Sequence, residues 1–107
     1  MNREVRIVPE AESNLVLVEA YLYISQDSPE RAMRWKSGIE ASINSLEKYP
    51  NRHAVVFDSE QTGREVRQML FGVYPIYYSV SEIAVNILAV RHGSRLPLQT
   101  NELPSDP

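Results

Sequence analysis

The sequence predicts an α+β fold of order β-α-α-β-β-β, in which a helical hairpin packs on one face of a small, mostly antiparallel sheet. Residues 10–49 carry apolar side chains at spacings of three and four, which is typical of helices. Residues 65–92 are rich in Val, Ile and Tyr and are interrupted by two short turns, which is typical of an antiparallel meander. The 107 residues contain no internal repeat, so we expect one domain.

The first two elements are a short strand and an amphipathic helix. Val5 and Ile7 alternate with polar residues in a strand over residues 4–8, which Pro9 ends. The helix then extends to about Ser25 and carries two apolar stripes. The first stripe is Ala11, Leu15, Val18 and Leu22, and the second is Leu17, Ala20, Tyr21 and Ile24.

A helix that is apolar on two sides is either enclosed in the core or offers one side to a partner, and both alternatives stay open. If one side is free, the second stripe is the candidate surface for a partner or for self-association. Its candidate residues are Leu17, Tyr21 and Ile24.

A second helix begins at Asp27-Ser28-Pro29-Glu30, where Ser28 is a cap and proline suits the first helical position. Its apolar face is Ala32, Trp35, Ile39, Ile43 and Leu46, and we expect it to end near Tyr49-Pro50. Because two or three residues link the helices, they should form an antiparallel hairpin.

The second half of the chain predicts three further strands, over residues 65–71, 74–80 and 84–92. A polar loop over 51–63 precedes them and contains a short extended piece at Val55-Val56-Phe57. The last strand is apolar on both faces, which predicts neighbours on both sides. We expect the domain to cover residues 1–95 and residues 96–107, with three prolines, to be a flexible tail.

Composition excludes several classes of protein. The chain has no Cys, which excludes a disulfide framework, a cysteine zinc site and thiol catalysis. A net charge of -3 is unusual for a protein that grips nucleic acid through its phosphates. No segment resembles a membrane span or a secretion signal, so we expect a cytoplasmic location. With two distant histidines and no glycine-rich phosphate loop, we expect no metal and no cofactor.

One cluster of side chains could carry chemistry. It is the arginine constellation, which comprises Arg64, Arg67, Arg91, His92 and Arg95. Guanidinium groups suit phosphate and carboxylate recognition, and the two ends of the meander that carry these residues could approach one another. The alternative is that the arginines solvate a sheet edge and pair with Glu65 or Asp58.

Motifs along residues 5–95 resemble those of the RelE/ParE superfamily of bacterial toxins from type II toxin–antitoxin modules. The segments that carry the resemblance are Val8-Pro9-x-Ala11, Ser28-Pro29-x-x-Ala32, Gly63-Arg64-Glu65-Val66-Arg67, Val73-Tyr74-x-Ile76-x-Tyr78 and Val90-Arg91-His92-Gly93-x-Arg95. The chain is most similar to the ParE-like, plasmid-stabilisation branch. The resemblance implies a cognate antitoxin as partner, which would wrap the toxin and cover apolar surface, in a homodimer or a toxin–antitoxin hetero-oligomer.

The resemblance allows two activities. RelE-like members cut messenger RNA on the ribosome, and in that case the arginine constellation, with His92 as proton shuttle, would be catalytic. ParE-like members bind and poison DNA gyrase. Pro75 follows Tyr74 where RelE-like members carry an arginine, and no Tyr follows His92, so the sequence favours a gyrase-binding toxin over an enzyme. A non-toxic binding module on the same fold is a further alternative, which a neighbouring antitoxin gene would disfavour.

Overall fold

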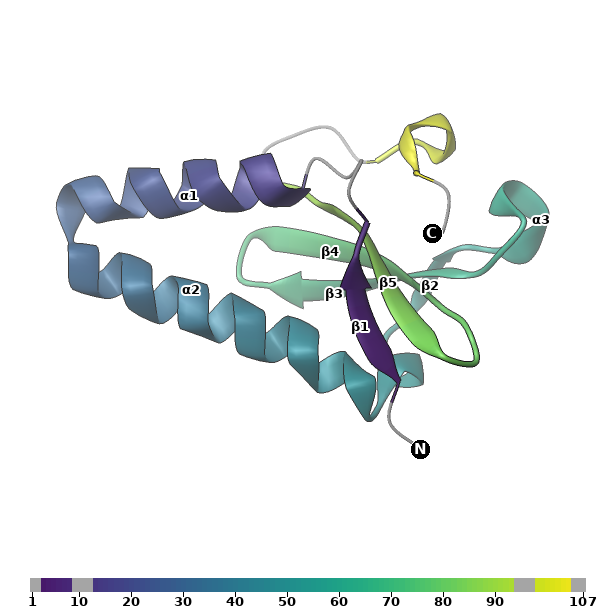
Figure 1. Ribbon diagram of the computed structural model, residues 1–107. Helices are drawn as coiled ribbons and strands as arrows, with labels where there is room; N and C mark the ends of the chain where they lie inside the picture. The colour runs from purple at the N-terminus through teal and green to yellow at the C-terminus, as the bar shows by residue number, and fades with distance from the viewer. Residues whose placement is uncertain (1–2, 9–12, 94–97, 105–107) are drawn as a thin grey trace.

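The computed structural model describes residues 3–8, 13–93 and 98–104, without the side chains of residues 13–15 (Figure 1). A five-stranded sheet has the order β1-β5-β4-β3-β2. Its strands are β1 (Glu4–Ile7), β2 (Val55–Phe57), β3 (Val66–Phe71), β4 (Tyr74–Val80) and β5 (Ala84–Val90). β1 is parallel to β5, and the other neighbours are antiparallel. The predicted α+β class, the mostly antiparallel sheet and the position of the last strand between two others are confirmed.

Two helices, α1 (Ser13–Asp27) and α2 (Pro29–Asn44), form the predicted antiparallel hairpin. The Ser28 hydroxyl accepts a hydrogen bond from the Arg31 backbone N–H at 3.2 Å, and Pro29 occupies the first turn. The predicted end of the second helix was five residues too late. A 3₁₀ turn over Ser45–Glu47 continues the chain instead, so apolar spacing persists past the end of the α-helix.

The hairpin covers one face of the sheet, and the main core lies between them. Its fully buried members come from α2, the turn after it and the central strands: Ile39, Ile43, Leu46, Met69, Ile76, Tyr78, Val85, Ile87 and Val90. Val16, Leu17 and Trp35 pack against this core from the two helices. Gly38 lets α2 approach β3 closely, since an added Cβ would lie 2.9 Å from the Phe71 ring.

The orientation of α1 distinguishes its two apolar stripes. Val18 and Leu22 from the first stripe are 54% and 56% exposed, whereas Ala20 from the second stripe is buried. Because both stripes are apolar, periodicity shows that one of them is buried and does not decide which. Ala11 and the Leu15 side chain, the other members of the first stripe, lie outside the described residues.

The opposite face of the sheet is covered by residues 98–104, which we call the C-terminal segment. Alternate residues of β4 and β5 point to this face, where Tyr77 and Leu88 form a second core cluster with Val8, Val66, Ala89 and Leu98. Leu98 is only 4% exposed, and a 3₁₀ turn follows at Thr100–Glu102. Residues 98–104 of the predicted tail therefore pack against the sheet, whereas residues 96–97 and 105–107 lie outside the described residues, and the domain boundary near residue 95 stays a prediction.

The loop between the hairpin and the meander also has more structure than expected. The extended piece is β2, which pairs with the start of β3 at the edge of the sheet. A short helix, α3 (Ser59–Thr62), follows, with Asp58 and Gln61 capping each other. Gly63 ends α3 at a φ of 80°, a conformation that favours glycine.

Candidate functional site

Arg67 lies at the start of β3, on the face that carries the hairpin. Its Nη1 donates hydrogen bonds to the backbone carbonyls of Asn51, at 3.1 Å, and His53, at 2.6 Å. Its Nη2 lies 3.7 Å from a Glu65 carboxylate oxygen. The guanidinium therefore ties the loop after α2 to the sheet.

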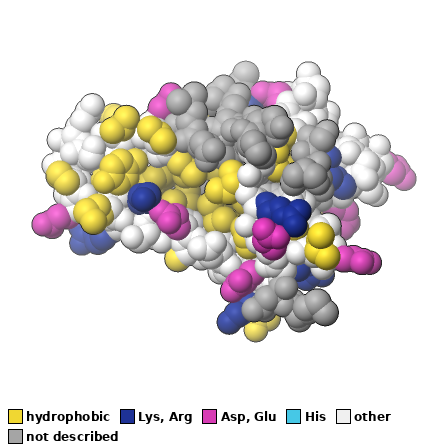
Figure 2. Space-filling model, viewed as in Figure 1, with side chains coloured by type: hydrophobic (Ala, Val, Ile, Leu, Met, Phe, Trp, Pro, Cys, Tyr) yellow, Lys and Arg dark blue, Asp and Glu magenta, His cyan; other side chains and the backbone are white. Residues whose placement is uncertain are grey.

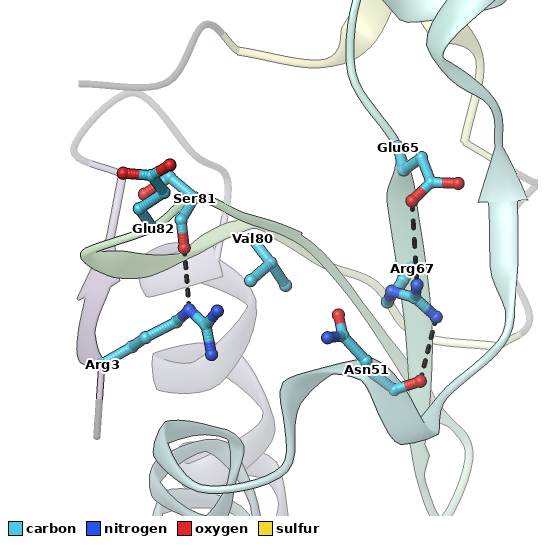
Figure 3. Close-up of a pocket in the computed structure, with 7 residues that line it drawn as sticks. All are labelled: Arg3, Asn51, Glu65, Arg67, Val80, Ser81 and Glu82. Atoms are coloured by element: carbon cyan, nitrogen blue, oxygen red, sulfur yellow. Dashed lines mark hydrogen bonds and ion pairs between the residues drawn. The ribbon is translucent and has the colours of Figure 1, made fainter. Parts of the chain in front are cut away.

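Figure 3 shows the cavity beside Arg67, which has a volume of about 380 Å³. Arg3 and Arg67 stand on opposite sides of it, and Arg3 Nε donates to the Ser81 carbonyl at 2.8 Å. The carboxylates of Glu65 and Glu82 line the same cavity. Two cations are thus matched by two anions, so this cavity has no charge excess with which to attract a phosphate.

Tyr78 and His53 lie beside Arg67, and their contacts stabilise the fold. The fully buried Tyr78 hydroxyl donates to the Pro50 carbonyl at 2.6 Å, and burial raises the Tyr78 pKa. Arg52 Nε donates to His53 Nε2 at 3.2 Å, which requires that nitrogen to be unprotonated. Burial and then the charges of Arg52 and Arg67 lower the His53 pKa.

Arg91 and Arg64 lie on the opposite face and contact the C-terminal segment. The Arg91 side chain is 5% exposed, and its Nη2 lies 2.5 Å from Oε2 of Glu102. Arg64 Nη2 donates to the Pro104 carbonyl at 2.6 Å. Both arginines therefore bind oxygen atoms of this same chain.

His92 lies at the end of β5 beside α1. Its ring meets the Tyr74 ring edge-on at 5.2 Å, and Tyr74 in turn meets Trp35 at 5.3 Å. Burial raises the Tyr74 pKa. A cavity of about 490 Å³ opens here, and its lining is mostly apolar residues of α1: Val16, Glu19, Ala20, Tyr23 and Ile24, with Tyr74 and His92 opposite.

Of the described members of the arginine constellation, the structure brings Arg64 and Arg91 to the same short segment and keeps Arg67 and His92 apart from them. β3 and β5 are both antiparallel to β4, so the start of β3 and the end of β5 lie at opposite ends of the sheet. On β4, Arg67 lies opposite Tyr78, whereas the Arg91 N–H donates to the Pro75 carbonyl. Tyr78 and Pro75 are three residues apart along β4, which is about 10 Å. Arg91 and His92 also point to opposite faces. Arg95 lies outside the described residues.

An apolar groove lies between α1 and α2, at the predicted partner surface. Figure 2 shows hydrophobic side chains gathered over the helical hairpin. The groove is lined by Leu17, Val18, Tyr21, Leu22, Trp35, Lys36, Ile39 and Glu40. Of the predicted partner residues, Leu17 and Tyr21 line this groove, and Ile24 lines the His92 cavity instead.

The family model described as the ParE toxin of type II toxin–antitoxin systems, parDE, matches residues 5–97. The chain belongs to the ParE toxin family. No curated protein matches the chain. The matched region of this ParE-family toxin contains the hairpin and the whole sheet, whereas the C-terminal segment lies beyond it.

The described residues of this ParE-family toxin offer neither a metal-binding cluster nor a membrane-spanning helix. Within residues 3–8, 13–93 and 98–104, no three side chains of His, Asp or Glu gather where they could hold a metal ion. None of the helices in the described part of the chain is long and apolar enough to cross a bilayer.

Sequence reasoning missed two features of this toxin. The sequence contains no signal that Val18 and Leu22 are exposed, because both stripes of α1 are apolar. The pairing of Arg91 with Glu102 had a weak sequence signal, because Glu102 follows Arg91 by eleven residues and Leu98 lies between them. The prolines around the C-terminal segment favoured a tail instead.

Proposed function

We propose that this chain is neutralised by a cognate antitoxin and inhibits growth by binding DNA gyrase, rather than by cleaving messenger RNA. The observation that carries this proposal is that Arg67 and His92 lie apart from each other and on the opposite face of the sheet from Arg64 and Arg91, which are engaged by the C-terminal segment. A binding toxin needs no convergent acid and base, whereas a nuclease does.

Phosphodiester cleavage requires a base, an acid and cations within a few ångströms of one phosphate. Arg67 is held by the carbonyls of Asn51 and His53, and Arg91 is buried against Glu102. Arginine stays protonated at neutral pH and is a poor base, so His92 alone could move a proton. Pro75 supplies no charge beside it. These contacts support a toxin that acts by binding.

The test uses purified toxin and purified gyrase in a supercoiling and DNA-cleavage assay. We expect the toxin to inhibit supercoiling in proportion to its concentration, and the protein encoded by the neighbouring antitoxin gene to restore it. A toxin that stops bacterial growth but leaves both gyrase reactions unchanged would contradict the gyrase proposal.

The groove between α1 and α2 supports the antitoxin part of the proposal. It is apolar, and Val18 and Leu22 are more than half exposed along it. Burying such side chains contributes roughly 25 cal/mol for each Å² removed from water, which suits a segment that orders on binding. The antitoxin segment would therefore lie along this groove with its apolar side against the hairpin.

Leu22→Ser should weaken antitoxin binding at least tenfold, because it removes an apolar contact from the groove. Met33→Ser is the matched control, since Met33 is 62% exposed on α2 and does not line the groove. Isothermal titration calorimetry compares the two. Equal affinities for the two variants would place the antitoxin elsewhere, and a change in mass on size-exclusion chromatography would identify the groove as a self-association surface.

A further inference from the structure

The C-terminal segment holds a buried cation of the sheet: Arg91 lies inside the region that the family model matches, and its partner Glu102 lies beyond that region. Arg91 belongs to the chain immediately after β5, where its N–H donates to Pro75 at 3.0 Å. Its side chain is nearly inaccessible, and the carboxylate that faces it comes from Glu102. The cation is thus fixed by the sheet, and the anion is supplied by a separate piece of chain.

A buried guanidinium needs an anion, because leaving such a charge unpaired away from water is strongly unfavourable. The sheet face is therefore a receptor whose chemistry demands a carboxylate at Arg91. Arg64 adds a second donor, which binds the Pro104 carbonyl two residues after Glu102. Together these two arginines recognise one side chain and one backbone oxygen of a short peptide.

The C-terminal segment is shaped to fit this receptor. Leu98 inserts into the apolar cluster of Val8, Val66, Tyr77 and Leu88. The 3₁₀ turn that follows is closed by the Gln99 N–H, which donates to Glu102 Oε1 at 2.9 Å and leaves Oε2 facing Arg91. Leucine and glutamate four residues apart are thus presented on the same side.

We infer that this face of the sheet is a binding site for a peptide with leucine four residues before glutamate, and that the C-terminal segment is its resident ligand. A protein partner that carries a segment of this chemistry, able to form the same 3₁₀ turn, exchanges with the resident ligand. The inference does not depend on the gyrase or antitoxin proposals, because it concerns the opposite face of the sheet from the hairpin.

The resident ligand has the advantage of being tethered. A tethered ligand acts at an effective concentration of the order of millimolar, so the intact chain should bind a free peptide of the same sequence poorly. Release of the C-terminal segment should expose the site and raise the affinity for that peptide. This difference separates a ligand site from ordinary core packing.

The experiment measures fluorescence anisotropy of a labelled peptide that spans residues 98–104, added to the full chain and to the full-length double variant Leu98→Ser, Glu102→Gln. We expect the double variant to bind the peptide at least tenfold more tightly than the unaltered chain. A control peptide carrying Glu102→Gln should lose at least tenfold in affinity for the double variant. Equal binding of the two peptides, or no binding to a folded double variant, would overturn the inference.

If circular dichroism shows that the double variant does not fold, the single variant Glu102→Gln decides by amide hydrogen exchange. We expect exchange in the C-terminal segment to become at least tenfold faster while exchange in β5 keeps its rate, as for a ligand that leaves its site. Unchanged exchange in the C-terminal segment, or equal acceleration in β5, would show that the segment is part of the core and would overturn the inference.

Discussion

One face of the sheet packs against the helical hairpin, and the other packs against the C-terminal segment. The hairpin face is closed by a continuous apolar core, to which α2 contributes Ile39 and Ile43. The second face is closed by one buried leucine, Leu98, and by the pairing of Arg91 with Glu102. The hairpin packs on the sheet through contacts repeated along the whole of α2, whereas the C-terminal segment is held by a few individual contacts. We therefore expect the hairpin face to dominate stability and the second face to open more readily.

The largest expected effect is on the hairpin face. Ile39→Ala should lower the free energy of unfolding by about 2–5 kcal/mol, because Ile39 is 1% exposed and its loss leaves a cavity in the main core. Urea denaturation measures it. Met33→Ala on the exposed side of the same helix is the control and should change stability by less than about 0.5 kcal/mol. A similar loss for both variants would mean that the hairpin is not packed as described.

A smaller effect is expected on the second face. Leu98→Ala should cost about 1–2 kcal/mol, less than an ordinary core truncation, because the C-terminal segment can detach while the sheet stays folded. The same urea series measures it. A loss as large as that of Ile39→Ala would contradict the difference between the two faces.

Tyr78 connects the hairpin face to the loop after α2. Tyr78→Phe should destabilise the protein by about 1–2 kcal/mol, since it removes the donor to the Pro50 carbonyl and adds no cavity. Thermal unfolding followed by circular dichroism measures the change. Tyr23→Phe is the control because Tyr23 is exposed. An unchanged midpoint for Tyr78→Phe would show that the loop is held by Arg67 alone.

The smallest effect is a dependence of stability on pH. Because the His53 pKa is lower in the folded chain than its ordinary value of 6.5, the unfolded chain binds a proton more readily. The stability that comes from a neutral His53 is fully present above pH 6.5. It is lost as the pH falls from the ordinary pKa through the lowered pKa of the folded chain. His53→Gln should therefore flatten the fall in stability between about pH 7 and pH 5. The same slope in the variant and the unaltered chain would contradict this role for His53.

The sequence predicted most of the hairpin face and little of the second face, for physical reasons. Helical spacing, the Ser28 cap and the short turn between strands 65–71 and 74–80 are local signals, and each corresponds to an observed element. Which stripe of α1 is buried depends on how the hairpin tilts on the sheet, which no local signal contains. The C-terminal segment has one buried leucine and no periodicity, so a pattern-based analysis could not distinguish it from a tail.

For the arginine constellation, residue type predicted the kind of atom that each arginine binds, but not where the arginines lie relative to one another. Arginine suits oxygen ligands, and Arg64, Arg67 and Arg91 all bind oxygen atoms. Their hydrogen-bond acceptors are backbone carbonyls and a carboxylate from 11 to 40 residues away in sequence, and Arg67 also pairs with Glu65, as the alternative hypothesis proposed. Such pairings depend on tertiary structure, so residue spacing alone suggested a convergent cluster where the fold has separate contacts.

Primer extension on messenger RNA, after induction of the chain in bacteria without its antitoxin, tests the central claim most directly. Because His92 lies apart from Arg64, Arg67 and Arg91, we expect growth arrest without new cuts at codon positions, for the unaltered chain and for His92→Ala alike. Codon-positioned cuts that appear with the unaltered chain and vanish with His92→Ala would contradict it and identify a ribosome-dependent endoribonuclease.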